Sequence, residues 1–405
     1  MKKKKLKTWV KVLIHIILLS AIIYLGLFIY GRLDTDNKND NKKQKVTTKS
    51  TETKKESNML SMVMVGDCLI HRFIYNDASN GDGTYSFDSM FDEVAPLIKG
   101  HDLAFYNQES IIGGKSLGLS AYPRFNSPEE IGDTMVNLGF NLVSLATNHT
   151  LDRGEQAIIN SRDYWNSKDN VLAVGSYSSN EEKDEIHILK KNNITYTMLN
   201  YTYGTNGIKV PSNKEYLVNV WPCTGNDPST DTKYQEYKKT VKEDIEKVRD
   251  KVDLLIVAIH WGIEYKYTPN EYQKDMASYL ASLGVNIIIG THPHVVEPIT
   301  YIDNTLVIYS LGNFVSAQDT VEDYNTRVGL LSTVTINKDS NNNISLSDLN
   351  NELIFTTDSS NSYKVIPFSN PDIKTYLNDY ERVYNKYSSI VKSIDDTIKI
   401  NSLSS

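Results

Sequence analysis

The chain has 405 residues, a formal net charge of −7 and two cysteines. This length accommodates one large domain or two smaller ones, and the negative charge disfavours a nucleic-acid-binding protein, which usually has a basic face. The two cysteines, Cys68 and Cys223, do not make the disulfide framework of a small secreted domain. We expect Cys68 to be a free side chain, with ligation of a metal by its thiolate as the alternative.

The N-terminus combines a lysine cluster with a long uncharged segment. Six lysines lie within residues 1–11, and residues 12–31 contain only apolar and small polar side chains apart from His15. A helix of about 20 apolar residues crosses a bilayer, and the positive flank stays in the cytoplasm. We therefore predict a single-pass anchor in the cell membrane at 12–31, with the main domain extracytoplasmic. A cleaved signal peptide is the alternative, but the apolar run is longer than in most signal peptides and no small-residue cleavage site follows it.

Beyond the anchor, composition divides the chain into three further parts. Residues 32–57 are almost free of apolar side chains, which predicts a disordered linker. Residues 58–340 alternate apolar strands with helical patterns, which predicts one α/β domain. Residues 341–405 read as a C-terminal extension of strand and helix, with a helical stretch at 372–400 and no cluster of chemically active residues.

Four short apolar runs of the predicted domain each lead to a candidate metal ligand. Buried parallel strands have such continuous apolar sequences, and ligands of open α/β sheets bind beyond the carboxyl ends of the strands. The sequence therefore predicts one shared site. The runs are Met59–Val65, Asn141–Ala146, Asp253–Ile259 and Val285–Ile289, and the residues that follow them are Asp67, Asn148, His149, His260, His292 and His294.

Several helices of the predicted domain have start and stop signals. Ser127 and Thr268 each precede a proline and a glutamate or asparagine, which predicts a hydroxyl N-cap followed by proline in the first turn. The two helices are expected to end near Gly139 and Gly284. Residues 235–251 form a charged amphipathic pattern, which predicts a helix with a solvated outer face before the strand of His260.

His292 and His294 are separated by a single proline. In an extended segment the side chains of residues two apart point the same way, and proline biases the residue before it towards extended geometry. The pair therefore predicts a metal-binding site, with an ordinary polar loop as the alternative. His260 is expected to be a third ligand, because a histidine at the end of an apolar strand needs a polar partner; the alternative is a core histidine that bonds a backbone carbonyl.

Further candidates follow the first and second strands of the predicted site. Asp67 supplies an anionic ligand and Asn148 a neutral oxygen ligand. His149 is predicted to donate a proton to a leaving group, with Asp152 orienting it. Asp152 is alternatively the N-cap of a helix at 154–166.

The remaining candidates have weaker signals. His71 would face the same way as Asp67 if the turn between them is helical, and Glu109 is placed to bridge two ions. Arg124 is expected to bind an anionic substrate. Asn107 and Glu264 are also assigned to substrate binding, and Glu264 is alternatively a residue that orients a metal ligand or is simply exposed.

The mixture of carboxylate, amide and imidazole ligands suits one or two ions of Mn, Zn or Fe rather than calcium. Two such ions about 3.5–4 Å apart activate water and stabilise a negatively charged transition state, which is the chemistry of a hydrolase. The sequence has no P-loop, no Gly-x-Ser-x-Gly elbow and no dinucleotide fingerprint, so several other enzyme classes are excluded.

Most of the candidate residues occur in six short motifs, which together cover about residues 60–320. The motifs are Val65-Gly66-Asp67, Asn107-x-Glu109, Ala146-Thr147-Asn148-His149-x-x-Asp152-x-Gly154, His260-Trp261-Gly262-x-Glu264, Gly290-Thr291-His292-Pro293-His294-Val295 and Tyr309-Ser310-Leu311-Gly312-Asn313-Phe314. In this order they resemble the CapA family of capsule and poly-γ-glutamate synthesis proteins. The resemblance implies a role in making or processing an anionic polymer such as poly-γ-glutamate, beside the subunits of a membrane synthase.

The same motifs are similar to those of calcineurin-like metallophosphoesterases, which implies a four-layer α/β sandwich with a two-metal site. Two elements depart from that pattern: position 69 is Leu where the superfamily has His, and Asn107-x-Glu109 replaces a Gly-Asp element. We expect a membrane-anchored, metal-dependent hydrolase of capsule production. The alternative from another class is a non-catalytic subunit that binds the polymer and guides it out of the synthase complex.

Overall fold

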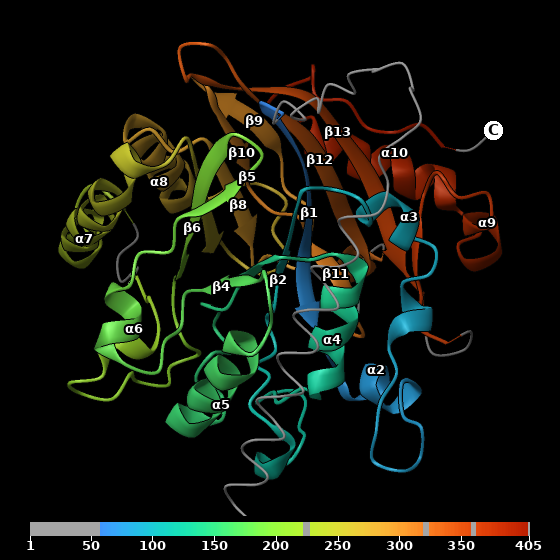
Figure 1. The fold of residues 1–405 in the computed structure, drawn as a ribbon. Helices are drawn as coiled ribbons and strands as arrows, with labels where there is room; N and C mark the ends of the chain where they lie inside the picture. The colour runs from blue at the N-terminus through green and yellow to red at the C-terminus, as the bar shows by residue number, and fades with distance from the viewer. Residues whose placement is uncertain (1–56, 222–226, 319–323, 358–361, 404–405) are drawn as a thin grey trace, which may run out of the picture. The chain divides into compact units, whose positions relative to one another are not determined.

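The computed structural model describes residues 57–221, 227–318, 324–357 and 362–403. These residues belong to a structural unit that covers residues 56–405, whose helices and strands are drawn in Figure 1. The predicted basic tail, membrane anchor and linker up to residue 56 lie outside the described residues. Among the helices of the described ranges, none is both long enough and apolar enough to cross a membrane.

The strands of the described residues form two sheets. The first contains β1 (Met59–Leu69), β2 (Leu103–Asn107), β3 (Leu142–Ser144), β4 (Leu172–Val174), β11 (Asn313–Ser316), β12 (Val328–Lys338), β13 (Ile344–Thr356) and β14 (Val365–Pro367). The second contains β5 (Leu189–Lys191), β6 (Ile194–Thr202), β7 (Leu254–His260), β8 (Ile287–Thr291), β9 (Ile299–Ile302) and β10 (Thr305–Ile308). The first sheet has the order β14-β13-β12-β1-β2-β3-β4 with β11 beside β1, and the second the order β5-β6-β7-β8-β10-β9. The predicted α/β class is therefore confirmed.

Most of the α-helices lie between these strands in sequence, and the last two follow β14. The helices are α2 (Arg72–Asp77), α3 (Ala95–Ile98), α4 (Glu129–Leu138), α5 (Gly154–Asn166), α6 (Asn180–Asp184), α7 (Thr232–Val248), α8 (Glu271–Ser282), α9 (Ile373–Tyr376) and α10 (Tyr380–Val391). Both predicted caps were wrong. The hydroxyl of Ser127 donates to Ser110 instead of capping α4, and α8 is capped by Asn270 rather than by Thr268. α4 does end at Gly139, which takes the left-handed conformation open to glycine.

Parallel pairing brings the candidate ligands of each sheet into register. In the first sheet Asp67 of β1 lies opposite Asn107 of β2 and Asn313 of β11. In the second sheet His260, the last residue of β7, lies opposite Thr291, the last residue of β8. The predicted runs are therefore strands, and their carboxyl ends meet as expected.

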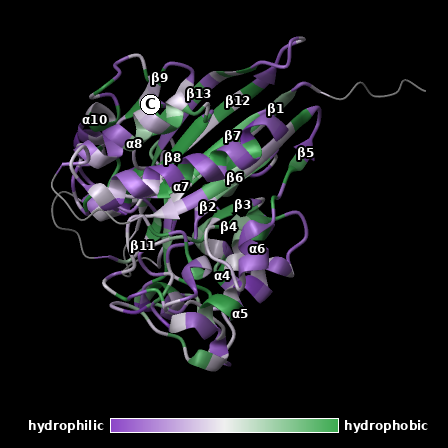
Figure 2. Cartoon of the chain, turned by 90° about the vertical axis from the view of Figure 1, so that its left-hand side faces the viewer, coloured by the Kyte–Doolittle hydropathy of each residue, from purple (hydrophilic) through white to green (hydrophobic). Residues whose placement is uncertain are grey.

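The apolar side chains of the central strands are divided between separate cores. In β7, Leu254 and Ile256 belong to a core that side chains of both sheets share, whereas Leu255 and Val257 belong to a second core with residues of α7 and α8. A third core joins the other face of β1 to α4. Burial on both faces explains why these strands are continuously apolar in sequence. Figure 2 shows hydrophobic colour concentrated on the strands and hydrophilic colour on α6 and much of α7.

The C-terminal part continues the first sheet. β13 pairs antiparallel with β12 along most of its length. The apolar side chains of α10, namely Val383, Tyr387 and Val391, lie in the core that both sheets share. The helical stretch predicted at 372–400 is divided into the short α9 and the longer α10. The predicted extension thus supplies strands and a helix to the same core as the rest of the domain.

Candidate metal centre

Asp67 is fully buried near the end of β1, and both of its carboxylate oxygens accept hydrogen bonds. Oδ1 accepts from the side-chain amide of Asn107 at 2.8 Å, and Oδ2 accepts from the backbone N–H of His292 at 3.2 Å. The strand is held close to the chain that precedes β11, because a Cβ at Gly66 would lie 1.8 Å from the carbonyl oxygen of Gly312. A glycine is therefore required beside Asp67 to let these two segments touch.

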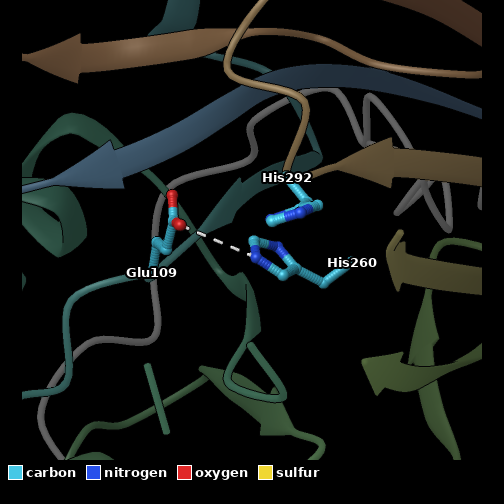
Figure 3. Close-up of side chains that lie close together, drawn as sticks. All are labelled: Glu109, His260 and His292. Carbon is cyan, nitrogen blue, oxygen red and sulfur yellow. Dashed lines mark ion pairs between the residues drawn. The ribbon is translucent and has the colours of Figure 1, made fainter. Parts of the chain in front are cut away.

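Glu109 follows β2 and is fully buried, yet neither of its carboxylate oxygens has a hydrogen-bond partner within the described residues. Its Oε1 lies 3.6 Å from Nε2 of His260 and 3.6 Å from Nε2 of His294. Figure 3 shows the first pair, with the ring of His292 beside that of His260. Burial raises the pKa of Glu109 well above its ordinary value, although His294 acts in the opposite direction. A cation between the carboxylate and the imidazoles would remove this cost of burial.

His260 is held by side chains on both sides of its ring. Nδ1 lies 3.0 Å from the hydroxyl of Thr291, and Nε2 lies 3.0 Å from Oδ1 of Asn148. Both partners are side chains, so the alternative of a core histidine bonded to a backbone carbonyl was wrong. Burial and the neighbouring imidazoles of His292 and His294 lower the pKa of His260 well below its ordinary value. The ring is therefore neutral, which is the form that binds a metal.

The segment that carries His292 and His294 is a sharp turn. Their φ angles are 98° and 58°, so the expectation of extended geometry was wrong. Left-handed backbone at a non-glycine residue costs about 1–3 kcal/mol and persists where surrounding contacts hold it. Here the backbone N–H of His292 is held by Asp67. The turn still brings the two rings together, with centroids 5.8 Å apart.

His294 has a defined ring orientation. Its Nδ1 lies 3.0 Å from Oδ1 of Asn313, whose amide group donates to the carbonyl of Thr326 at 2.8 Å. The amide therefore presents its oxygen to the ring, so Nδ1 carries a hydrogen and Nε2 faces Glu109. Burial lowers the pKa of His294, but the carboxylates of Glu109 and Asp67 outweigh it and raise the pKa to about 10.

His292 has an unsatisfied ring nitrogen. Its Nδ1 is buried without a hydrogen-bond partner in the part of the chain that the structure describes. The ring packs against Tyr203 and His260, with centroid distances of 4.4 and 4.8 Å. Burial, and then His294 and His149, lower the pKa of His292 well below its ordinary value. This neutral ring is a second buried group whose free atom a bound cation would satisfy.

These side chains form three sets in which the ligand atoms lie within 4.8 Å of one another. The residues present therefore fit a divalent metal: the donor set is rich in imidazole and carboxylate, and the unsatisfied atoms of Glu109 and His292 lie within it. Glu109 belongs to two of the sets. The identity of the metal and the number of ions stay predictions. The sets are Glu109, His260 and His292; Asp67, Glu109 and His294; and Glu264, His292 and His294.

His149 and Asp152 form a hydrogen-bonded pair beside these sets. Nδ1 of His149 lies 2.7 Å from Oδ2 of Asp152, which also accepts from the backbone N–H of Phe125 at 2.6 Å. The ring of Phe125 packs edge-on against His149, with centroids 4.7 Å apart. α5 starts after Arg153 without a side-chain cap. Asp152 therefore orients His149 and does not cap the helix.

A cavity of about 780 Å³ opens beside the cluster. His294, His149 and Asp152 line it together with Asn148 and Glu264. A volume of this size is typical of small-molecule and substrate sites, which measure about 300–1,000 Å³. The cavity gives a substrate access to both the ligand sets and the histidine–aspartate pair.

The other predicted residues are distributed around this cavity. His71 lines it with its Nδ1 3.2 Å from the carbonyl of Leu69, and it belongs to none of the ligand sets of the described residues. Its role as a ligand stays a prediction. Arg124 is exposed and lines the cavity, and exposed Glu264 lies with two histidines. Asn107 is buried and donates to Asp67, and its assignment to substrate binding stays a prediction.

Sequence patterns did not single out two side chains that position the site. Asn313, which orients His294, was noted only as part of a motif, although its place after an apolar strand and a glycine resembles that of the other strand-end residues. Asn206 lies in a loop, where its side chain contacts Asn148 at 3.3 Å and His149 at 3.4 Å. No periodic pattern surrounds Asn206, so only the folded structure identifies it. Cys68 is a free buried cysteine, as expected.

The chain is similar to two curated capsule proteins. It is 28% identical over 310 residues to the PGA biosynthesis protein CapA of Bacillus subtilis (strain 168), an alignment that covers 75% of this chain and 73% of that protein. It is 25% identical over 277 residues to the capsule biosynthesis protein CapA of Bacillus anthracis, covering 65% of this chain and 61% of that protein. The chain thus spans less than two thirds of the second relative.

Solved structures with a similar course of the backbone share little sequence with this chain. The NAD nucleotidase NadN of Haemophilus influenzae has a TM-score of 0.44 and 10% identity over 86% of this chain and 65% of that chain. GAP50, the anchor in the inner membrane complex of Plasmodium, has a TM-score of 0.35 and 10% identity, over 86% and 98%. The purple acid phosphatase PPD1 of yellow lupin has a TM-score of 0.34 and 12% identity, over 77% and 54%.

One family model covers the region that contains every candidate ligand. The model described as bacterial capsule synthesis protein PGA_cap matches residues 61–318. All three ligand sets and the His149–Asp152 pair lie within this range. Because the match extends over more than half of the 405 residues, the chain belongs to the PGA_cap family of bacterial capsule synthesis proteins.

Proposed function

We propose that this chain is a metal-dependent hydrolase that acts in poly-γ-glutamate capsule production on the outer side of the cell membrane. The observation that carries the proposal is Glu109, a buried carboxylate that accepts no hydrogen bond from the described residues and is shared by two ligand sets. An unpaired buried carboxylate is costly, and a cation is the partner that its imidazole-lined surroundings suit. The name of one relative, a PGA biosynthesis protein, supplies the polymer, and the name of the other supplies the capsule.

In this proposal the ions are held by the strand-end residues of both sheets. Asp67, Glu109 and His294 would hold one ion, and Glu109, His260 and His292, with Asn148 in contact with His260, would hold the other. The chemistry that divalent ions would supply there is Lewis acidity and the activation of water at neutral pH. The bond is an ester of phosphate or an amide of the polymer.

In this proposal His149, paired with Asp152, transfers the proton that the reaction requires. Asp152 faces Nδ1 of His149, so Nε2 is the ring atom left to give a proton to the leaving group. The contact with Phe125 fixes the plane of the ring. His149 therefore acts as the general acid at the edge of the cavity, and Asp152 holds its ring in position.

The test is the double variant His292→Ala/His294→Ala in the full chain, with His187→Ala as a control that removes a histidine outside the ligand sets. After reconstitution with Mn²⁺ or Zn²⁺, we expect the double variant to lose bound metal and to stop producing or processing polymer, while the control keeps both. Metal content equal to that of the wild type would contradict the proposal. Loss of metal with polymer handling unchanged would favour the non-catalytic polymer-binding and export subunit.

The membrane location is a separate part of the proposal and rests on residues 1–31, where a lysine cluster precedes an apolar segment. Deleting this range should release the protein from the membrane fraction of cells. Protease added to intact spheroplasts should degrade the main domain of the full chain. Protection of that domain would contradict an extracytoplasmic location.

A further inference from the structure

Arg72 and Arg124 differ from the other arginines of the described residues because their side chains have no hydrogen bond or ion pair there. A guanidinium carries five donors and is normally engaged. The remaining described arginines are all engaged: Arg153, Arg162, Arg249, Arg327 and Arg382. The two free guanidinium groups are therefore available to a ligand.

Both free arginines line the same cavity beside the ligand sets. Arg72 is the first residue of α2, whereas Arg124 lies in the loop before α4. Each has an exposed aromatic residue close by in sequence: Phe73 is 63% exposed and Tyr122 is 77% exposed, the two highest values among the exposed large hydrophobic side chains of the described residues. These two aromatic residues also line the cavity. Both α2 and the loop before α4 thus contribute one arginine and one exposed aromatic residue to the lining of the cavity.

The cavity lining contains two carboxylates as well as the two arginines. Its carboxylates are Asp152, which is bonded to His149, and Glu264, which lies with the histidines of the cluster. No lysine contributes to the lining within the described residues. The carboxylates of the lining thus have partners elsewhere, and the two arginines keep their charge available to an anionic ligand.

We propose that Arg72 and Arg124 form an anion-binding subsite in the lining of the cavity. The subsite takes carboxylate or phosphate groups of an extended ligand, and Phe73 and Tyr122 contact the apolar parts between those groups. A planar guanidinium bonds such anions through two parallel N–H groups. The subsite deepens the proposed function, on which it rests, since it holds the ligand outside the metal cluster while a bond within the cavity is cleaved.

The test compares Arg72→Gln/Arg124→Gln with the wild type in the full chain, by isothermal titration of a short oligo-γ-glutamate and, separately, of inorganic phosphate. The control is Arg382→Gln, which removes an equal charge from α10, outside the cavity. Each lost charge-assisted contact should weaken binding about tenfold, so the double variant should bind the oligomer about a hundredfold more weakly. The difference should shrink at high salt, because both arginines are exposed.

The two titrations identify the source of the anion. Weaker binding of the oligomer alone supports polymer carboxylates, and weaker binding of phosphate supports a phosphoester ligand. Unchanged binding of both in the double variant overturns the subsite. Metal content measured in the same samples separates this result from the proposed function: the arginine variant should keep its metal, whereas His292→Ala/His294→Ala should lose metal and still bind the oligomer.

Discussion

Replacing Glu109 by glutamine should change stability in opposite directions with and without metal. In the metal-free protein the carboxylate is buried without a donor, and burial raises its pKa well above the ordinary value. Glutamine keeps the shape, removes the charge and brings an amide donor to within reach of imidazole nitrogens that lie 3.6 Å from the present oxygen. The charge of His294, 3.6 Å away, offsets only part of the cost of burial, because the pKa of Glu109 stays raised in its presence. The metal-free variant should therefore be more stable than the metal-free wild type.

The size of each change in unfolding free energy follows from the cost of the unsatisfied carboxylate and from the stabilisation by bound metal. An unsatisfied buried polar group costs about 1–3 kcal/mol, so the metal-free Glu109→Gln protein should gain about that amount. A ligand at a hundred times its Kd stabilises the folded state by about 2.7 kcal/mol. The wild type should gain this stabilisation from Mn²⁺ or Zn²⁺, whereas the variant should gain less than about 1 kcal/mol, because it has lost the anion that two of the ligand sets share.

Urea unfolding of both proteins, with a chelator and then with the metal, measures the four free energies. Glu352→Gln is a matched control, because Glu352 is also buried but accepts from Ser369 at 2.8 Å and from Asn401 at 2.7 Å. Its loss of two charge-assisted bonds should lower stability by about 1–3 kcal/mol and leave the metal effect intact. A metal-free Glu109→Gln protein that is less stable than the wild type, or one that keeps the full metal effect, would refute the reasoning.

Three further substitutions test other parts of the structure. Burial raises the pKa of Glu297 to about 8 from 4.5, so the folded state keeps a proton that the unfolded state loses between these values. Stability should therefore fall on the order of 5 kcal/mol as pH rises through that window, and Glu297→Gln should flatten this decline in urea unfolding at a series of pH values. Asp152→Asn should lower kcat of the proposed hydrolysis about 10²–10⁴-fold without loss of bound metal, and an unchanged rate would remove His149 from the reaction. Gly66→Ala should cost about 3 kcal/mol or more by chemical denaturation, because its Cβ meets a backbone oxygen at 1.8 Å, whereas Gly204→Ala, with nothing within 4 Å, should stay within about 0.5 kcal/mol. Equal losses in the two glycine variants would contradict the close approach.

Apolar patterning was sufficient to predict the strands that carry the site. β7 and β8 are buried on both faces, so almost every residue in them is apolar and the polar residue that ends each run is conspicuous. Helix starts were harder, because several polar side chains compete for the same backbone groups. Ser127 found a partner in Ser110, and Asn270 capped α8 in place of Thr268.

The conformation of the His292–His294 turn could not be predicted from local preferences. Proline favours extended backbone before it, but His292 takes a φ of 98° because its N–H bonds Asp67, more than two hundred residues away in sequence. The same holds for Asn206, which contacts Asn148 and His149 from a loop with no regular pattern. Contacts between segments distant in sequence override local propensity at these places.

The division of the site between the two sheets explains why six motifs accompany it and why only some contain ligands. Asp67 and Glu109 come from the first sheet, whereas His260 comes from the second, so a bound ion would join the carboxyl ends of both. The last motif supplies no member of the ligand sets. It is the crossing from β10 in the second sheet to β11 in the first, where the carbonyl of Gly312 accepts the N–H of Asp67 and Asn313 orients His294. Since ligands and crossing are held by the same contacts, metal binding should be coupled to unfolding of the whole domain and not of a loop.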